Sequence, residues 1–180
     1  SEVFASVSSS LPFVRGLTVS GGECTLYPEF LVEMAEEAHK RKKTLFVDTN
    51  GQIDFSTLPN LVEYIDSFMV DLKAHDNQSF LSLVGNPNEH IVENIKLLLE
   101  KGKLFEVRTV LVPNAMDMEA TVRLGASLIE NHPEVRYKLI SYRDNGVRSE
   151  YLGLRGPTNE ELETCLQILQ HHQIQDVVVI

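Results

Sequence analysis

Short apolar segments alternate along this chain with longer segments of helical periodicity, and this alternation restricts the fold more than any other feature. Strands are expected near residues 16–20, 44–48, 67–71, 104–111, 135–141 and 175–180. Helices are expected near residues 28–42, 58–65, 77–84, 89–101, 117–131 and 158–171. Because segments such as Phe68-Met69-Val70 are apolar throughout, the strands are expected to be parallel and covered by helices. Repeated right-handed βα units form either an open doubly wound sheet or a (β/α) barrel.

The ends of several predicted helices carry specific signals. Asp117 and Thr158 are expected N-caps, because their side-chain oxygens can accept hydrogen bonds from the first free amides of a helix. Gly102 is expected to end the helix that contains three consecutive leucines. The stretch from Tyr142 to Pro157 is the longest segment predicted to be irregular.

The composition of the chain excludes several classes of function. A length of 180 residues with 43% hydrophobic residues is sufficient for one well-packed domain, predicted to span residues 1–180. The net charge of -10 argues against nucleic-acid binding, and no apolar run is long enough to span a membrane. Two distant cysteines, Cys24 and Cys165, make no disulfide framework, which is typical of a soluble protein of the reducing cytoplasm. The histidines show no metal-ligand spacing.

Polar residues recur where the predicted strands end. In chain order these are Gly21-Gly22-Glu23, Asp48-Thr49-Asn50-Gly51, Asp71-Leu72-Lys73, Arg108 and Tyr142-Arg143. The functional face of a parallel barrel is the one at the carboxyl ends of its strands. Acidic and basic groups are therefore expected to meet on one rim, which suits a zwitterionic ligand or a cation together with an anion.

Each of these segments also has a purely structural interpretation. Asp48-Thr49-Asn50-Gly51 is ordinary turn sequence, and Asp71 with Lys73 would make a surface ion pair worth about 0–1 kcal/mol. Arg108 is harder to explain in this way, since a guanidinium in an apolar strand needs an anionic partner. The occurrence of these groups at successive strand ends favours a functional site.

The same segments resemble the radical S-adenosylmethionine (SAM) enzymes. The element Thr18-Val19-Ser20-Gly21-Gly22-Glu23 resembles one that is shared across that superfamily. The later elements Asp48-Thr49-Asn50-Gly51, Val70-Asp71-Leu72-Lys73 and Arg108-Thr109-Val110-Leu111-Val112-Pro113 are most similar to the glycyl-radical-enzyme activating branch, the pyruvate formate-lyase activating enzyme type. The resemblance covers nearly the whole chain. It implies an α/β fold, an incomplete (β/α) barrel of about five to six mostly parallel strands with outer helices.

The resemblance also implies a role for each residue. Residues implied to contact SAM are Gly21, Gly22 and Glu23 at its amino group, Asp71 and Lys73 at its ribose and carboxylate, and Asp48, Arg108 and Arg143 facing it. Residues implied to hold a monovalent cation beside SAM are Asp48, Thr49, Asp71 and, through its carbonyl, Met69. Asp48 and Asn50 are further implied to meet the glycyl-radical loop of a partner enzyme. The anionic partner of Arg108 is then expected to be the methionyl carboxylate.

The chain departs from the superfamily pattern at its cysteines. It contains no Cys-x3-Cys-x2-Cys segment, so no ligands of a [4Fe-4S] cluster are expected within it. Cys24 is expected to be a passive small residue, and Arg143 stands near the place of a typical histidine. We interpret the chain as the C-terminal portion of a longer activase that lacks the cluster-binding first βα unit. An open barrel of this kind is expected to expose an apolar edge and to dimerise or aggregate.

The resemblance implies an activity for the intact enzyme. Reductive cleavage of SAM at a [4Fe-4S] cluster, present only in the full-length protein, would generate a 5′-deoxyadenosyl radical and then a glycyl radical on a partner. The implied partners are a glycyl radical enzyme and reduced flavodoxin or ferredoxin as electron donor. This chain would supply SAM-binding residues and be inactive alone. One alternative is a non-catalytic barrel fragment that acts as a partner-binding module. A phosphate-binding barrel enzyme is a weaker one, because Gly146, Gly153 and Gly156 fit no phosphate-loop pattern.

Overall fold

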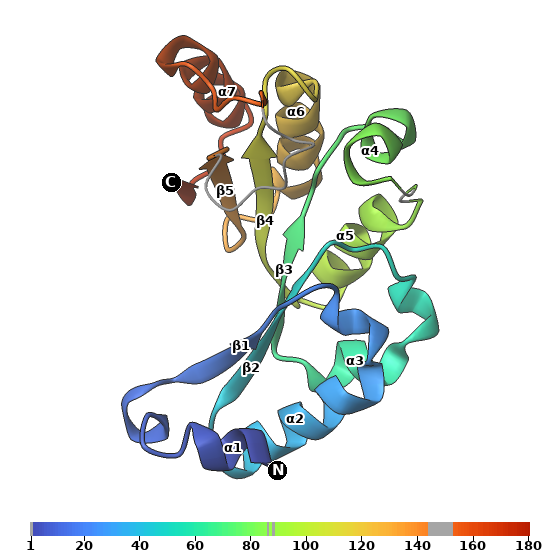
Figure 1. Ribbon diagram of the computed structural model, residues 1–180, viewed down its shortest axis with the longest axis vertical. Coiled ribbons are helices and arrows are strands. Elements are labelled where there is room, and N and C mark those ends of the chain that lie inside the picture. The colour runs from blue at the N-terminus through green and yellow to red at the C-terminus, as the bar shows by residue number, and fades with distance from the viewer. Residues whose placement is uncertain (1, 86, 88, 144–152) are drawn as a thin grey trace.

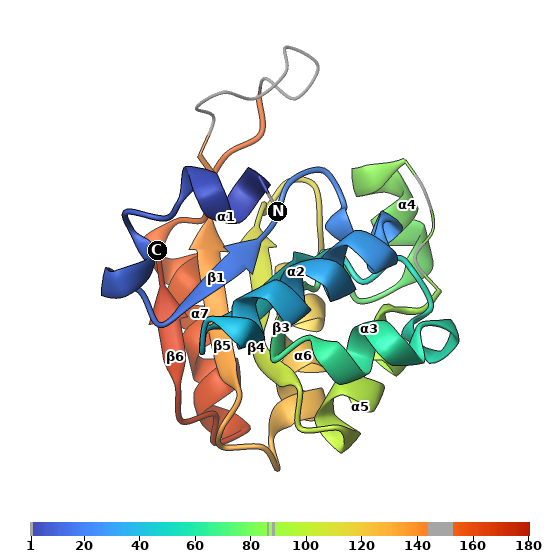
Figure 2. The ribbon, with the colours of Figure 1, turned by 90° about the horizontal axis from the view of Figure 1, so that it is seen from below.

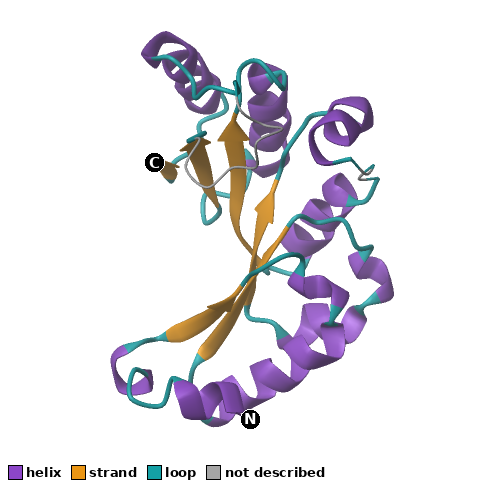
Figure 3. Cartoon of the chain, viewed as in Figure 1, coloured by secondary structure: helices purple, strands orange, loops and turns teal. Residues whose placement is uncertain are grey.

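The chain folds around a single twisted sheet of parallel strands (Figures 1 and 3). The computed structural model describes residues 2–85, 87, 89–143 and 153–180. The strands are β1 (Gly16–Val19), β2 (Thr44–Thr49), β3 (Ser67–Asp71), β4 (Leu104–Leu111), β5 (Arg136–Ser141) and β6 (Val177–Val179). They lie side by side in chain order, and each neighbouring pair is parallel. The predicted fold class, an incomplete (β/α) barrel of parallel strands with outer helices, is confirmed.

Helices connect the strands, and their positions also agree with the sequence. The α-helices are α1 (Glu2–Ser6), α2 (Pro28–Lys40), α3 (Pro59–Tyr64), α4 (Asn77–Val84), α5 (Ile91–Glu100), α6 (Met118–Ile129) and α7 (Asn159–His171). Three short 3₁₀ helices, η1 (Leu11–Phe13), η2 (Cys24–Leu26) and η3 (Phe55–Thr57), fall in segments for which the sequence predicted no structure. These turns are too short to show a helical period, which is why pattern analysis misses them.

The predicted helix boundaries have their expected physical causes. The Asp117 side chain accepts a hydrogen bond from the backbone N–H of Ala120 at 2.9 Å and caps α6. Thr158 and Glu161 form a reciprocal capping box at the start of α7. After α5, Gly102 adopts a φ of +63°, a conformation that glycine enters more easily than other residues. These signals are local, so they can be recognised before the fold is known.

The two faces of the sheet have different surroundings. Alternate residues such as Leu45, Val47, Phe68 and Val70 point into the helical layer and are completely buried. Residues between them, such as Asp48, are only half-buried and point to the opposite face. The helices thus lie on the outer side of the curved sheet (Figures 1 and 2), and the other face carries Asp48 and further polar side chains of the strands.

Both edges of the sheet are formed by short strands. Within the described residues, β1 pairs only with β2, and β6 pairs only with β5. Self-association through such an edge stays a prediction. Of the segment predicted to be irregular, residues 144–152, including Gly146, lie outside the described residues. None of the described helices is long and apolar enough to cross a membrane.

Candidate ligand site at the carboxyl edge of the sheet

The carboxyl ends of β2 and β3 and the middle of β4 bring three predicted site residues together on the open face of the sheet. In the strand register, Asp48 of β2 lies opposite Met69 of β3, and Asp71 lies opposite Arg108 of β4. Because side chains alternate along a strand, Asp48, Asp71 and Arg108 all project from the same face. The parallel register therefore converts three distant sequence positions into one cluster.

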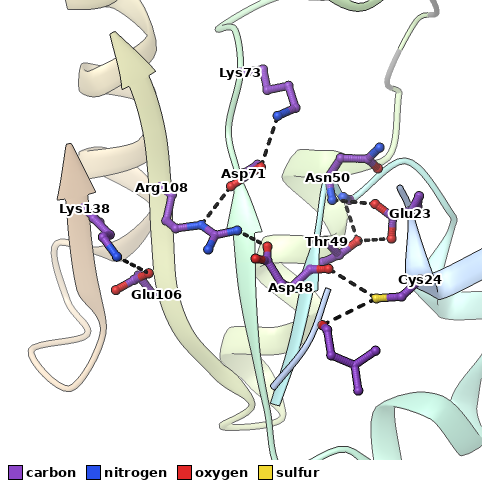
Figure 4. A network of polar contacts seen from close by, with 12 residues as sticks. Glu23, Cys24, Asp48, Thr49, Asn50, Asp71, Lys73, Glu106, Arg108 and Lys138 are labelled. Carbon is purple, nitrogen blue, oxygen red and sulfur yellow. Dashed lines mark hydrogen bonds and ion pairs between the residues drawn. The ribbon is translucent and has the colours of Figure 1, made fainter. Parts of the chain in front are cut away.

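The guanidinium of Arg108 lies between the two carboxylates (Figure 4). Its Nε donates to Asp71 Oδ1 at 2.8 Å, and its Nη2 forms an ion pair with Asp48 Oδ1. The Arg108 side chain is only 13% exposed, and burial lowers the pKa of the guanidinium. The expectation that Arg108 needs an anionic partner is confirmed. Its partners are two carboxylates of the chain itself, whereas the sequence suggested a ligand carboxylate.

Lys73 extends this cluster toward solvent. Its ammonium Nζ lies 3.1 Å from Asp71 Oδ2, and the two side chains are 30% and 24% exposed. Asp71 thus bridges Arg108 and Lys73, one on each carboxylate oxygen. The pair is part of a larger charge network on the open face, which an isolated surface ion pair would not be.

The turn after β1 contributes backbone and one carboxylate. Gly21 has a φ of +116°, and a Cβ atom built on Gly21 or Gly22 would meet no other atom within 4 Å. These two glycines therefore border open space, as a close approach by a ligand requires. The carboxylate of Glu23, by contrast, is bound by the end of β2. Its Oε1 accepts a hydrogen bond from Thr49 Oγ1 at 2.8 Å, and its Oε2 accepts one from the backbone N–H of Asn50 at 2.7 Å.

A pocket of about 260 Å³ opens between these groups. It is lined by residues of the first three strand ends, namely Ser20, Gly21, Gly22, Glu23, Asp48, Thr49, Asn50, Asp71 and Lys73. A larger cavity of about 610 Å³ lies in the helical layer, where residues of α3 and α5 line it. The smaller pocket is the better candidate site, because the polar residues that the sequence singled out at the strand ends line it.

The residues implied to hold a monovalent cation are not gathered in this structure. Thr49 projects into the buried helical face, where its hydroxyl binds Glu23, whereas Asp48 and Asp71 bind Arg108 on the open face. Within the part of the chain that the structure describes, no group of three or more His, Cys, Asp or Glu side chains fits a metal ion. Arg143 is exposed, two residues beyond the end of β5.

Cys24 has a structural role in this turn. Its thiol donates to the carbonyl oxygen of Asp48 at 3.3 Å and lies 3.7 Å from that of Val19, so it joins the ends of β1 and β2. Burial, and secondarily the charge of Glu23, raise the thiol pKa to about 11. A thiol with this pKa is almost entirely protonated at neutral pH, as expected for a passive residue.

The sequence analysis missed two buried polar residues, one on a strand and one on a helix. Glu106 of β4 is 2% exposed and lies 3.6 Å from Arg136 Nη1 and 4.0 Å from Lys138 Nζ of β5. Asn94 of α5 is also 2% exposed. The sequence does mark both residues as exceptions. Glu106 and Arg108 are charges two residues apart in an apolar strand, and Asn94 is an amide among the apolar positions of a helix.

Comparisons with known proteins agree with the family resemblance that the sequence suggested. The sequence model described as the Radical SAM superfamily matches residues 5–125. The putative glycyl-radical enzyme activating enzyme of Haemophilus influenzae is 30% identical over 169 residues, 82% of this chain and 64% of that protein. The isethionate sulfite-lyase activating enzyme of Desulfovibrio desulfuricans is 30% identical over 148 residues, 81% of this chain and 47% of that protein.

A solved structure shows the same fold. A domain of pyruvate-formate lyase-activating enzyme from Bacteroides vulgatus superimposes with a TM-score of 0.77 at 24% identity. The match covers 93% of this chain and 99% of that domain. Against the curated relatives named above, by contrast, this chain spans between 47% and 64% of their length.

Proposed function

This chain belongs to the radical SAM superfamily, and we propose on this basis that its carboxyl edge holds SAM within a glycyl-radical-enzyme activating enzyme. The relatives named above are activating enzymes of this kind. The observation that carries the proposal is the pocket beside Gly21 and Gly22, where Asp48, Asp71 and Lys73 bring charges of both signs to one rim.

The chemistry of the pocket fits SAM. The methionyl part of SAM carries an ammonium and a carboxylate, and its sulfur is a sulfonium. The open backbone at Gly21 and Gly22 suits the ammonium, with Glu23 and Asp48 supplying negative charge nearby. Lys73 suits the carboxylate, and the carboxylate of Asp71 suits the ribose hydroxyls. We propose that Arg108 faces SAM while neutralising Asp48 and Asp71, and that Arg143 approaches it from the end of β5.

The residues present do not fit the iron–sulfur cluster. The chain has only two cysteines, Cys24 and Cys165, and burial raises the pKa of both thiols to about 11. A [4Fe-4S] cluster needs several closely placed thiolates. The cluster, which in this superfamily supplies the electron that cleaves the SAM sulfonium, would need ligands from outside this chain. We therefore propose that the chain alone binds and orients SAM and is inactive by itself.

The partners follow from the same proposal. The substrate would be a glycine residue of a glycyl radical enzyme, and Asp48 and Asn50 at the rim of the pocket would meet its loop. The electron donor would be reduced flavodoxin or ferredoxin. A monovalent cation at Asp48, Thr49, Met69 and Asp71 is part of the proposal and would require Asp48 and Asp71 to turn away from Arg108.

The test is made on the natural gene product, purified anaerobically and reconstituted with iron and sulfide. We expect a reduced [4Fe-4S] signal in its EPR spectrum that changes when SAM is added. The variant Lys73→Ala should weaken this response to SAM. Lys96→Ala, which removes an exposed lysine paired with Glu93 on α5, is the matched control and should respond like the wild type.

Two results would contradict the proposal. The first is a purified protein that assembles no cluster, and the second is a cluster whose EPR spectrum does not change when SAM is added. Either would favour the alternative of a non-catalytic module that binds a partner protein.

A further inference from the structure

A buried amide that does not line the pocket holds the loop that follows β2. Asn94 lies on α5 among the apolar residues Ile91, Ile95 and Leu98, and it is 2% exposed. An unpaired amide at such a position would be strongly unfavourable. Asn94 therefore needs polar partners within the protein.

Those partners are all backbone groups of one loop. Asn94 Nδ2 donates to the carbonyl oxygens of Gly51 at 2.9 Å and Ile53 at 2.7 Å, and its Oδ1 accepts from the N–H of Phe55 at 2.9 Å. The loop runs from the end of β2 to η3, so it has no strand partner to satisfy these groups. One side chain thus replaces a missing ladder of backbone hydrogen bonds.

The same loop is fixed from its other side by Glu23. The hydroxyl of Thr49 accepts from the N–H of Gly51 at 3.0 Å and donates to Glu23 Oε1 at 2.8 Å. The N–H of Asn50 donates to Glu23 Oε2 at 2.7 Å (Figure 4). Thr25 adds two further bonds to Oε1, from its N–H at 3.1 Å and its hydroxyl at 2.6 Å. A carboxylate has about four acceptor sites, so Glu23 has little capacity left for a ligand.

We propose that Asn94 and Glu23 are positioning residues that clamp the loop of residues 49–55 between α5 and the turn after β1. The loop borders the pocket through Asn50, and its anchor on β2 adjoins Asp48. Removing the hydrogen bonds of Asn94 would then make the loop at the rim of the pocket more mobile, without removing any group that lines the pocket. The inference rests on the proposed function where it concerns SAM, and on the hydrogen bonds alone where it concerns the loop.

The position of Gly51 supports this role of the loop. Gly51 has a φ of +66°, and a Cβ atom there would lie 3.1 Å from Ile91 Cγ1 of α5. The loop therefore approaches the helix closely only because residue 51 is a glycine. This contact places the carbonyl of Gly51 within reach of Asn94, which lies one helical turn after Ile91.

The variants Asn94→Ala and Asn94→Asp test the clamp in the natural gene product. Alanine removes all three hydrogen bonds, whereas aspartate keeps the shape and the acceptor but loses both donors. Val122→Ala, in the buried face of α6, is the control that lowers stability without touching the loop. Hydrogen exchange of residues 51–55 and affinity for SAM are measured below the unfolding transition of each variant.

We expect both Asn94 variants to speed exchange in residues 51–55 and to weaken SAM binding, each by roughly tenfold. At an equal loss of melting temperature, Val122→Ala should change neither the exchange in residues 51–55 nor the affinity for SAM. Unchanged exchange in residues 51–55 of Asn94→Ala would overturn the clamp. If exchange rises but SAM binding does not change, the clamp is structural and the positioning role is wrong. A wild type that binds no SAM would overturn the proposed function, while the exchange measurement would still decide the clamp.

Discussion

Two charge clusters lie two residues apart on β4, and they have opposite arrangements. At the carboxyl edge, the cation Arg108 lies between the anions Asp48 and Asp71, at hydrogen-bonding distance. Farther down the strand, the anion Glu106 lies between the cations Arg136 and Lys138, at 3.6 and 4.0 Å. Both clusters are on the same face of the sheet (Figure 4).

The difference lies in how well each central charge is compensated. The fork of Arg108 donates to both of its partners, whereas the two cations near Glu106 stand beyond good hydrogen-bonding distance. Arg136 is also engaged elsewhere, with Asp176 at 3.1 Å and above the ring of Phe105. Burial consequently raises the pKa of Glu106, although both cations act to lower it. Proximity of opposite charges is therefore insufficient to stabilise a buried ion.

The largest expected effect follows from removing the better compensated ion. Arg108→Ala would leave Asp48 without its cation and Asp71 with Lys73 alone, so we expect a loss of about 3–5 kcal/mol in the free energy of unfolding. Urea denaturation at pH 7 measures this loss. Arg108→Lys keeps the charge but cannot span both carboxylates, and should lie between alanine and wild type. A loss below about 1 kcal/mol for Arg108→Ala would show that the cluster is effectively solvated.

A large effect is also expected on the reactivity of Cys24, which lies at the edge that holds the Arg108 cluster. Cys24 bonds to the carbonyl of Asp48, and its thiol pKa is raised from 9.0 to about 11. At pH 8 this lowers the thiolate fraction about a hundredfold, so iodoacetamide should alkylate Cys24 about a hundred times more slowly in the native chain than in urea. Cys165→Ser makes the measurement specific to Cys24. Equal rates in the two conditions would mean that the edge opens readily.

A smaller effect is expected at the poorly compensated ion. Because the folded pKa of Glu106 is raised above its ordinary value of 4.5, the native state binds this proton more tightly than the unfolded state. The free energy of unfolding should therefore fall as the pH rises from 4.5 through the raised pKa. Glu106→Gln should remove this fall and, at neutral pH, come within about 1 kcal/mol of the wild type or exceed it. Denaturation curves between pH 4 and 8 measure this fall in the free energy of unfolding. A Glu106→Gln variant whose free energy of unfolding falls with pH as steeply as that of the wild type would contradict the prediction.

The smallest effect is expected for Lys138. Its ammonium is 4.0 Å from Glu106, and its side chain is 25% exposed. Lys138→Met should cost less than about 1 kcal/mol and raise the pKa of Glu106 further, since a lowering influence is lost. The shift is measurable from the side-chain carboxyl resonance in an NMR titration. A large loss of stability would instead place Lys138 among the well-compensated ions.

The sequence allowed the fold and the edge of the site to be predicted because both depend on periodicity. Parallel strands end at one edge, so Asp48, Asp71 and Arg108 could be brought together without knowledge of side-chain geometry. Which groups then pair could not be predicted, since one rotamer decides whether Arg108 turns to Asp48 or to a ligand. The same limit applies to Glu23, whose carboxylate turns toward Asn50.

Other residues were missed because they occupy predicted core positions. Asn94 lies where the helical period requires an apolar side chain, and its partners are backbone groups more than 38 residues away in the chain. Sequence patterns identify such a residue as an exception, but they do not say which loop it satisfies. The loop conformation had to be known first.

The order of the strands has a consequence for how such a protein can change over time. Within the described residues, every strand pairs with the strand before or after it in the chain, so the backbone hydrogen-bond ladder joins only βα units that are neighbours in the chain. A loop at the carboxyl edge can lengthen or shorten between two units without disturbing the register of the remaining ladder. Natural variation can thus change the rim, and with it the choice of molecules that bind there, while the sheet keeps its strand order and register.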